Sequence, residues 1–147
     1  MKLFKIISIY IIGLLYIIVG IKHFTNPDFF MVIVPPYIKW KYEAVLISGF
    51  FEIFFGLLLL FERTRKTASW CIILLLIAIF PANIYLFTSD LPRELLGVTK
   101  KQALIRLPFQ FSLMIISFWH SKNSQSKSFS IICIVLFFLT ILYFMSI

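Results

Sequence analysis

Five long runs that are almost free of charge determine what this chain can fold into. They cover residues 3–21, 44–61, 67–87, 103–119 and 129–147. Each is about as long as the roughly 17–25 residues that a helix needs to cross the hydrocarbon core of a bilayer. Lipid offers no partner to an open backbone, and continuous apolar runs lack the alternation of a transmembrane β-barrel. The sequence therefore predicts an all-α fold, a polytopic transmembrane helical bundle.

The composition excludes several other classes of protein. Apolar residues make up 61% of the chain and its mean hydropathy is +1.01, more than a soluble domain of 147 residues can bury. The net charge of +8 comes from basic residues that lie between the apolar runs, where they anchor helix ends at lipid headgroups. We therefore expect the bilayer, and no nucleic acid, as the partner of these charges.

The connections between the runs differ from one another. Residues 27–34 form a short apolar piece, with Pro27 at its start and Pro35 at its end, which is expected to be an interfacial helix. Residues 88–101 are expected to be an exposed loop. A polar linker, 122–128, separates a four-helix membrane domain at residues 1–121 from the fifth span.

The charges also bear on orientation and location. Lys2 and Lys5 lie at the start of the first run, before the apolar residues 6–21; this run lacks a signal-peptide cleavage site and is expected to be retained as a transmembrane helix. The short basic turn at residues 62–66 is expected on the same side as these lysines. The positive-inside rule then favours a cytoplasmic N-terminus in a multi-pass membrane protein.

Polar and small residues recur within the first four spans. They stand three or four residues apart in the first two spans, which places them on one helix face. They are Gly13, Tyr16, Gly20 and His23 in span one; Gly49, Glu52 and Gly56 in span two; Pro81 and Asn83 in span three; and Arg106, Pro108 and Gln110 in span four. Ionisable groups at membrane depth are costly, so we expect these polar groups to converge inside the bundle.

Each of these residues also has a structural interpretation. The glycines are expected to let helices approach closely, and the two prolines to modify helix packing. Asn83 can simply join two helices, His23 can be an interfacial side chain, and Arg106 can extend to the headgroups. Glu52 is different because it lies mid-span and its side chain is short. We therefore predict that Glu52 points into the bundle, within direct or one-water reach of at least one of four groups. Those groups are His23, Asn83, Arg106 and Gln110.

Five short motifs resemble those of the DoxX family of small bacterial membrane proteins, specifically its DoxX-like branch. Gly20, His23 and Phe24 match a Gly-x-x-His-Phe element, and a loop proline follows at Pro35 or Pro36. The other matches lie in the next three spans. They are Gly49, Glu52 and Gly56 in span two, residues 81–84 (Pro-Ala-Asn-Ile) in span three, and residues 106–110 (Arg-Leu-Pro-Phe-Gln) in span four.

This resemblance covers residues 1 to about 120 and implies a four-helix DoxX-like core, to which residues 129–147 add a C-terminal transmembrane helix. It also implies a link to membrane quinone chemistry, because the family's namesake resembles a subunit of a thiosulfate:quinone oxidoreductase. The fifth span departs from the family pattern and suggests a helix for packing or for a partner.

The sequence has no haem-ligating histidine pair, flavin fingerprint or Cys-x-x-Cys motif, so we expect no metal site and no redox enzyme that works alone. Three functions remain. The chain is a quinone-binding or accessory subunit of a membrane redox system, with quinone as the candidate ligand; or a structural or assembly protein; or a small proton-coupled transporter. The first predicts a redox-complex partner, and a homo-oligomer is the other expected assembly.

Overall fold

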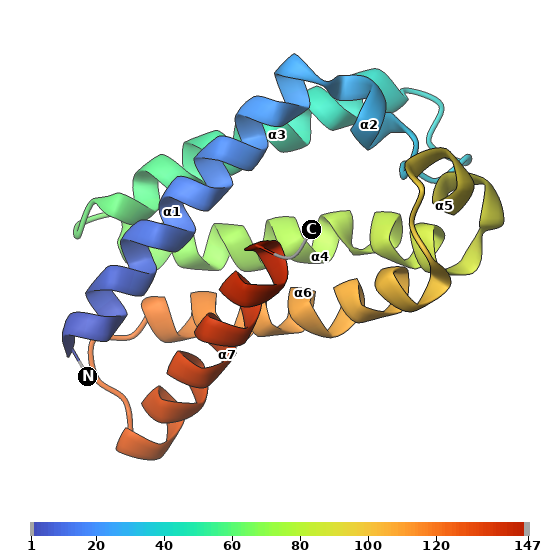
Figure 1. The fold of residues 1–147 in the computed structure, drawn as a ribbon. Coiled ribbons are helices and arrows are strands. Elements are labelled where there is room, and N and C mark those ends of the chain that lie inside the picture. Colours follow the sequence, from blue (N-terminus) through green and yellow to red (C-terminus); the bar gives the residue numbers. More distant parts are fainter. Residues whose placement is uncertain (1, 146–147) are drawn as a thin grey trace.

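The computed structural model describes residues 2–145, which form seven helices and no strand (Figure 1). Five of them are long and apolar enough to cross a membrane. They are α1 (Lys2–Thr25), α3 (Lys41–Leu60), α4 (Arg65–Thr88), α6 (Lys100–His120) and α7 (Lys127–Met145). The predicted all-α membrane bundle is confirmed. Residues 146–147, at the end of the predicted fifth span, lie outside the described residues.

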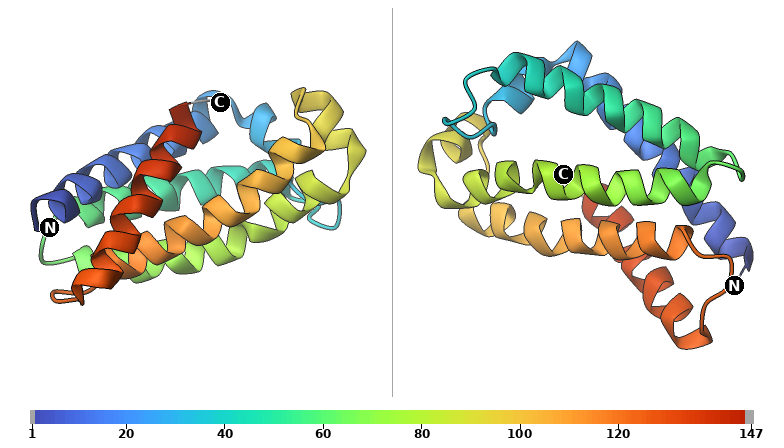
Figure 2. Two further views of the ribbon diagram at one scale, coloured as in Figure 1. Left: turned by 60° about the horizontal axis from the view of Figure 1, so that its bottom comes forward. Right: turned by 180° about the vertical axis from the view of Figure 1, so that it is seen from behind.

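The long helices are arranged as two antiparallel pairs and a crossing helix. α1 packs along α3, α4 packs along α6, and the α3–α4 contact joins the two pairs (Figure 1). α7 packs on α6 and crosses the pairs obliquely, as the two further views also show (Figure 2). A common apolar core, including Ile12, Leu59, Ile72 and Ile116, lies where the pairs meet, and Phe137 of α7 contacts it.

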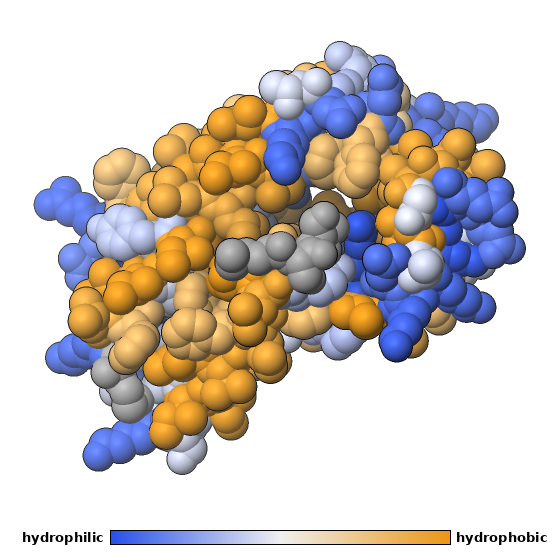
Figure 3. Space-filling model, viewed as in Figure 1, coloured by the Kyte–Doolittle hydropathy of each residue, from blue (hydrophilic) through white to orange (hydrophobic). Residues whose placement is uncertain are grey.

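The outward surface of the spans is apolar. Many large side chains on the long helices are exposed, among them Leu14 on α1, Phe50 on α3 and Leu74 on α4. Figure 3 shows this apolar surface over the middle of the molecule and hydrophilic residues towards its ends. A folded protein exposes such a surface only to lipid or to a partner, so the chain is a multi-pass membrane protein.

The helix bounds differ from the predicted spans by a few residues. The reason is that charged residues flanking the apolar runs are also helical. The two short helices differ more. α2 covers only Pro27–Met31, shorter than the predicted 27–34, and the loop predicted at 88–101 contains α5 (Asp90–Leu96). Gly97 ends α5 in the left-handed conformation, with φ of 62°.

Arg93 on α5 explains why that segment is folded back on α4. Its buried guanidinium donates hydrogen bonds to the carbonyls of Leu86 and Phe87, at the end of α4, and is paired with Asp90. A cation at a helix C-terminus satisfies free carbonyls and complements the helix dipole. Arg93 therefore acts as a C-terminal cap for α4, a role that the sequence did not suggest.

Candidate functional site

The α1–α3 interface is built on glycine. A methyl group added at Gly20 would lie 2.6 Å from the carbonyl oxygen of Gly49, and one added at Gly49 would lie 2.5 Å from Cβ of His23. Gly13 and Gly56 make a similar approach about two turns away. At Gly20, Gly49 and Gly56 the nearest atoms belong to the backbone or to a Cβ, so a larger residue would move the helices apart; at Gly13 the nearest atom is the end of the Leu60 side chain, which can turn away. The predicted packing role of the glycines is therefore what the structure shows.

This close approach brings Glu52 of α3 to His23 of α1. Glu52 Oε2 lies 3.2 Å from His23 Nδ1, and both side chains are more than nine-tenths buried. The expected approach of Glu52 to at least one of the four named groups is thus confirmed for His23. The His23 ring also contacts the Phe30 ring of α2, with centroids 3.7 Å apart.

Polar atoms of this pair lack well-directed hydrogen bonds. In the described residues, His23 Nδ1 and Glu52 Oε2 are close but have no partner of good hydrogen-bond geometry, and the same holds for the buried hydroxyl of Tyr16. Tyr16 lies two turns before His23 on the same face of α1, and its Cβ would lie 3.1 Å from a methyl group added at Gly56, one turn after Glu52 on α3. Buried polar atoms without partners cost free energy, so a proton, water or ligand group is expected to complete this cluster, defined here as Tyr16, His23 and Glu52.

Asn83 and Gln110 form a second pair, between α4 and α6. Asn83 Nδ2 donates to Gln110 Oε1 at 2.7 Å, and Gln110 Nε2 donates to the carbonyl of Leu76 at 2.6 Å. Leu76 lies five residues before Pro81 and next to Ile77, whose carbonyl loses its helical donor because proline has no N–H. Gln110 therefore joins α6 to this proline-containing part of α4, and both α4 and α6 remain helical through Pro81 and Pro108.

The polar residues therefore do not all converge on one point. Within residues 2–145 no hydrogen bond or ion pair links the Glu52–His23 pair to the Asn83–Gln110 pair. Arg106 interacts with the hydroxyl of Tyr143 on α7. The physical reason is the arrangement in two helix pairs, in which each polar residue finds its partner on the neighbouring helix. Among the described residues, the five predicted site residues thus contact one another as two polar pairs, with Arg106 contacting α7; that they serve one site stays a prediction.

The sequence did not predict a further polar contact, between Ser8 and His120. Ser8 Oγ lies 2.8 Å from Nε2 of His120, both buried, and joins the start of α1 to the end of α6. Ser8 Oγ also donates to the Lys5 carbonyl at 2.9 Å, so the imidazole Nε2–H is the donor to Ser8. His120 directly follows the fourth apolar run, 103–119, so the sequence suggested a position outside the spans. The signal available was the spacing of Ser8, Ile12 and Tyr16, which extends the buried face of α1 to its first turns.

The described residues contain no group of three or more His, Cys, Asp or Glu that could hold a metal ion. Their chemistry is that of an intramembrane carboxyl, an imidazole and a phenol. The fold and this cluster define a class: a five-span helical membrane protein with a buried acid–histidine pair.

The chain belongs to the family described as a domain of unknown function (DUF8561), whose model matches residues 12–121. No curated protein and no solved structure matches it. The matched range includes α1 from Ile12 onward through α6, and with them both polar pairs. The DoxX resemblance rests on the motifs alone and stays a prediction.

Proposed function

We propose that this chain is a quinone-binding or accessory subunit of a membrane redox system, with the Tyr16, His23 and Glu52 cluster as the polar end of its binding site. The observation that carries the proposal is the buried His23–Glu52 pair, 3.2 Å apart, whose facing atoms lack well-directed hydrogen bonds. An intramembrane ionisable pair is unusual and marks proton or ligand chemistry more often than packing.

The residue types suit a quinone. Its carbonyl oxygens need hydrogen-bond donors, which the imidazole and the phenol can supply, and its ring needs an apolar or aromatic wall, which Phe30 can supply beside His23. Reduction of a quinone takes two electrons and two protons. The electrons would come from a partner subunit, and the carboxyl and the imidazole would pass the protons.

The motif resemblance supports the same class of function, because it implies a link to quinone-dependent oxidoreductases. The proposal also places the protein in the bacterial inner membrane with its N-terminus in the cytoplasm. This orientation is supported by the leading Lys2 and Lys5 and by the basic turn at residues 62–66. The partner is then a redox subunit, or a second copy that completes the site.

A structural or assembly role is the second candidate, and the Asn83–Gln110–Leu76 hydrogen bonds favour it. These bonds are made entirely within the protein and tie two helices together. A structural role needs no ligand at Glu52, so the two candidates differ in what a conservative substitution there would do.

The test is quinone binding by the whole chain. The protein is purified in mild detergent from native membranes, copurifying quinone is quantified by mass spectrometry, and redox difference spectra are recorded with added quinone. We expect bound quinone in the wild type, loss of it in Glu52→Gln, and retention in Glu62→Gln, which removes an exposed carboxyl in the α3–α4 turn. Equal quinone content in all three proteins, or none in the wild type, would favour the structural role.

A further inference from the structure

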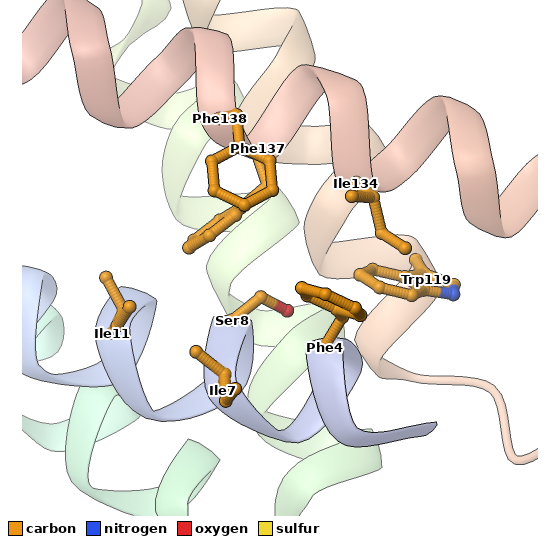
Figure 4. Close-up of a pocket in the computed structure, with 8 residues that line it drawn as sticks. All are labelled: Phe4, Ile7, Ser8, Ile11, Trp119, Ile134, Phe137 and Phe138. Atoms are coloured by element: carbon orange, nitrogen blue, oxygen red, sulfur yellow. The ribbon is translucent and has the colours of Figure 1, made fainter. Parts of the chain in front are cut away.

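A cavity of about 250 Å³ lies between α1 and α7, at the end of the bundle where α1 begins. Phe4, Ile7 and Ile11 line it from α1, Ile134 and Phe137 face them from α7, and Trp119 closes one side (Figure 4). Ser8 adds a single hydroxyl group to an otherwise apolar lining. Ser8 lies 15 residues before His23 on one helix, so it is roughly 22 Å along α1 from His23 and, since Tyr16 follows it by eight residues, roughly 12 Å from Tyr16.

This cavity is made mainly by parts of the chain outside the family match. Seven of its eight lining residues lie before residue 12 or after residue 121, and Trp119 is the exception. The cavity therefore depends on α7 and on the first turns of α1. It is independent of the Glu52–His23 pair and of the function proposed for that pair.

The cavity has a closed floor and a side that faces lipid. Trp119 is 2% exposed and Phe137 is 6% exposed, whereas Phe4 and Phe138 are each 49% exposed. Its volume is slightly below the roughly 300–1,000 Å³ of pockets that hold drug-sized molecules. An apolar space of this size beside the bilayer suits one hydrocarbon chain better than a ring system.

Positive charge surrounds the cavity at the membrane surface. The Lys5 ammonium lies 5.5 Å from the centre of the Trp119 ring and donates to the Lys122 carbonyl. The Lys122 ammonium lies 5.0 Å from the centre of the Phe118 ring. The helix ends at this side of the bundle carry further basic residues and one acidic residue, Glu62. The basic residues are Lys2, Arg63, Arg65, Lys66 and Lys127.

We propose that the cavity holds one acyl chain of an anionic phospholipid, whose phosphate lies against the ammonium groups of Lys5 and Lys122. The apolar lining fits the chain, and the charge complements the phosphate, since basic groups at a membrane surface attract anionic lipids. The lipid would occupy the space between α1 and α7, which contact each other only slightly, and so hold the fifth span against the first.

The test uses the full chain in vesicles of phosphatidylglycerol or phosphatidylcholine with identical acyl chains. Lipid retained after transfer to detergent is measured by native mass spectrometry, and a phosphatidylglycerol with a photoreactive acyl chain locates the contact. Two variants address the two halves of the site: Lys5→Gln removes a cation, and Ile134→Trp fills the cavity. Their matched controls are Lys101→Gln, an exposed lysine in the first turn of α6 at the other end of the bundle, and Ile131→Trp, an exposed position on α7 outside the lining.

We expect phosphatidylglycerol to be retained in preference to phosphatidylcholine, with crosslinks to peptides that contain Phe4 or Phe137. Lys5→Gln should lower retention about fivefold, the factor that one basic residue near a membrane surface contributes, and Ile134→Trp should abolish the crosslink. Both controls should behave as the wild type. Equal retention of the two lipids, or wild-type retention and crosslinking in both Lys5→Gln and Ile134→Trp, would overturn the proposal. So would a dimer in which α7 of a second copy covers the cavity. Lys5→Gln replaces a side chain at the membrane surface, so its result stands even if Ile134→Trp does not fold.

Discussion

Glu52 Oε2 lies 3.2 Å from His23 Nδ1, across an interface where α1 and α3 meet through glycine. Two buried ionisable groups at this distance can share or exchange a proton. The carboxyl and the imidazole are thus held together by the backbone approach of two helices, and this relationship is the source of the first two predictions.

The first prediction separates the chemistry of Glu52 from its packing. Glu52→Gln keeps the shape and removes the titratable group, so the protein should fold and should lose any quinone-linked or proton-linked function. Glu52→Leu also removes the partner of His23, and should lower the free energy of unfolding by about 1–3 kcal/mol. Thermal unfolding in detergent, followed by tryptophan fluorescence, measures the second effect. If Glu52→Gln keeps full quinone binding, the ionisable carboxyl is not needed to bind the quinone.

The second prediction concerns Gly20. Gly20→Ala places a methyl group 2.6 Å from the carbonyl oxygen of Gly49, a backbone atom that cannot turn away. We expect a loss of about 1–3 kcal/mol in stability from overpacking, together with weaker quinone binding because His23 and Glu52 move apart. Ile18→Ala, at an exposed position of the same helix, is the control and should have little effect. Wild-type stability and wild-type binding in Gly20→Ala would show that the helices are not in this close contact.

The third prediction tests whether the two polar pairs are separate. In a double-mutant cycle, Asn83→Leu and Gln110→Leu should be non-additive by about 0.6–1.7 kcal/mol, the range for hydrogen bonds between membrane helices. The cycle of Glu52→Gln with Gln110→Leu should be additive within about 0.5 kcal/mol. Strong coupling in the second cycle would restore the single shared site that the sequence suggested.

The fourth prediction concerns topology. Five spans place the two ends of the chain on opposite sides of the membrane. Reporter fusions at Lys127 and after Ile147 should therefore report opposite compartments, with the Lys127 fusion on the same side as the N-terminus. A result in which both report one side would mean that α7 lies along the membrane surface.

Most of the fold could be predicted because the apolar runs are long and their ends are charged or polar. The packing face formed by the glycines and Glu52 could also be predicted, since a spacing of three or four residues defines a helix face. The depth of Glu52 could be predicted because it lies in the middle of its apolar run. α5 could not be predicted in this way. It depends on Arg93 reaching back to the end of α4, a tertiary contact without a periodic pattern.

The partition of the polar residues could not be predicted either. The sequence shows that Glu52, Asn83 and Gln110 lie inside spans, but not which helices are neighbours. The pairing depends on which helices pack together: α1 with α3, and α4 with α6. The Ser8–His120 contact was missed for a related reason, because it joins residues 112 positions apart at the ends of two helices.

The pairing of neighbouring helices has a consequence for biogenesis. α1 and α3 are consecutive spans, and so are α4 and α6, so each polar pair is contained in one helical hairpin. When the ribosome delivers α3 to the translocon, Glu52 meets a histidine that has already arrived with α1, and Gln110 meets Asn83 in the same way. A lone carboxyl or amide would make insertion of its span costly. This arrangement would let the chain enter the bilayer two helices at a time, with each polar side chain matched as soon as its own hairpin is complete.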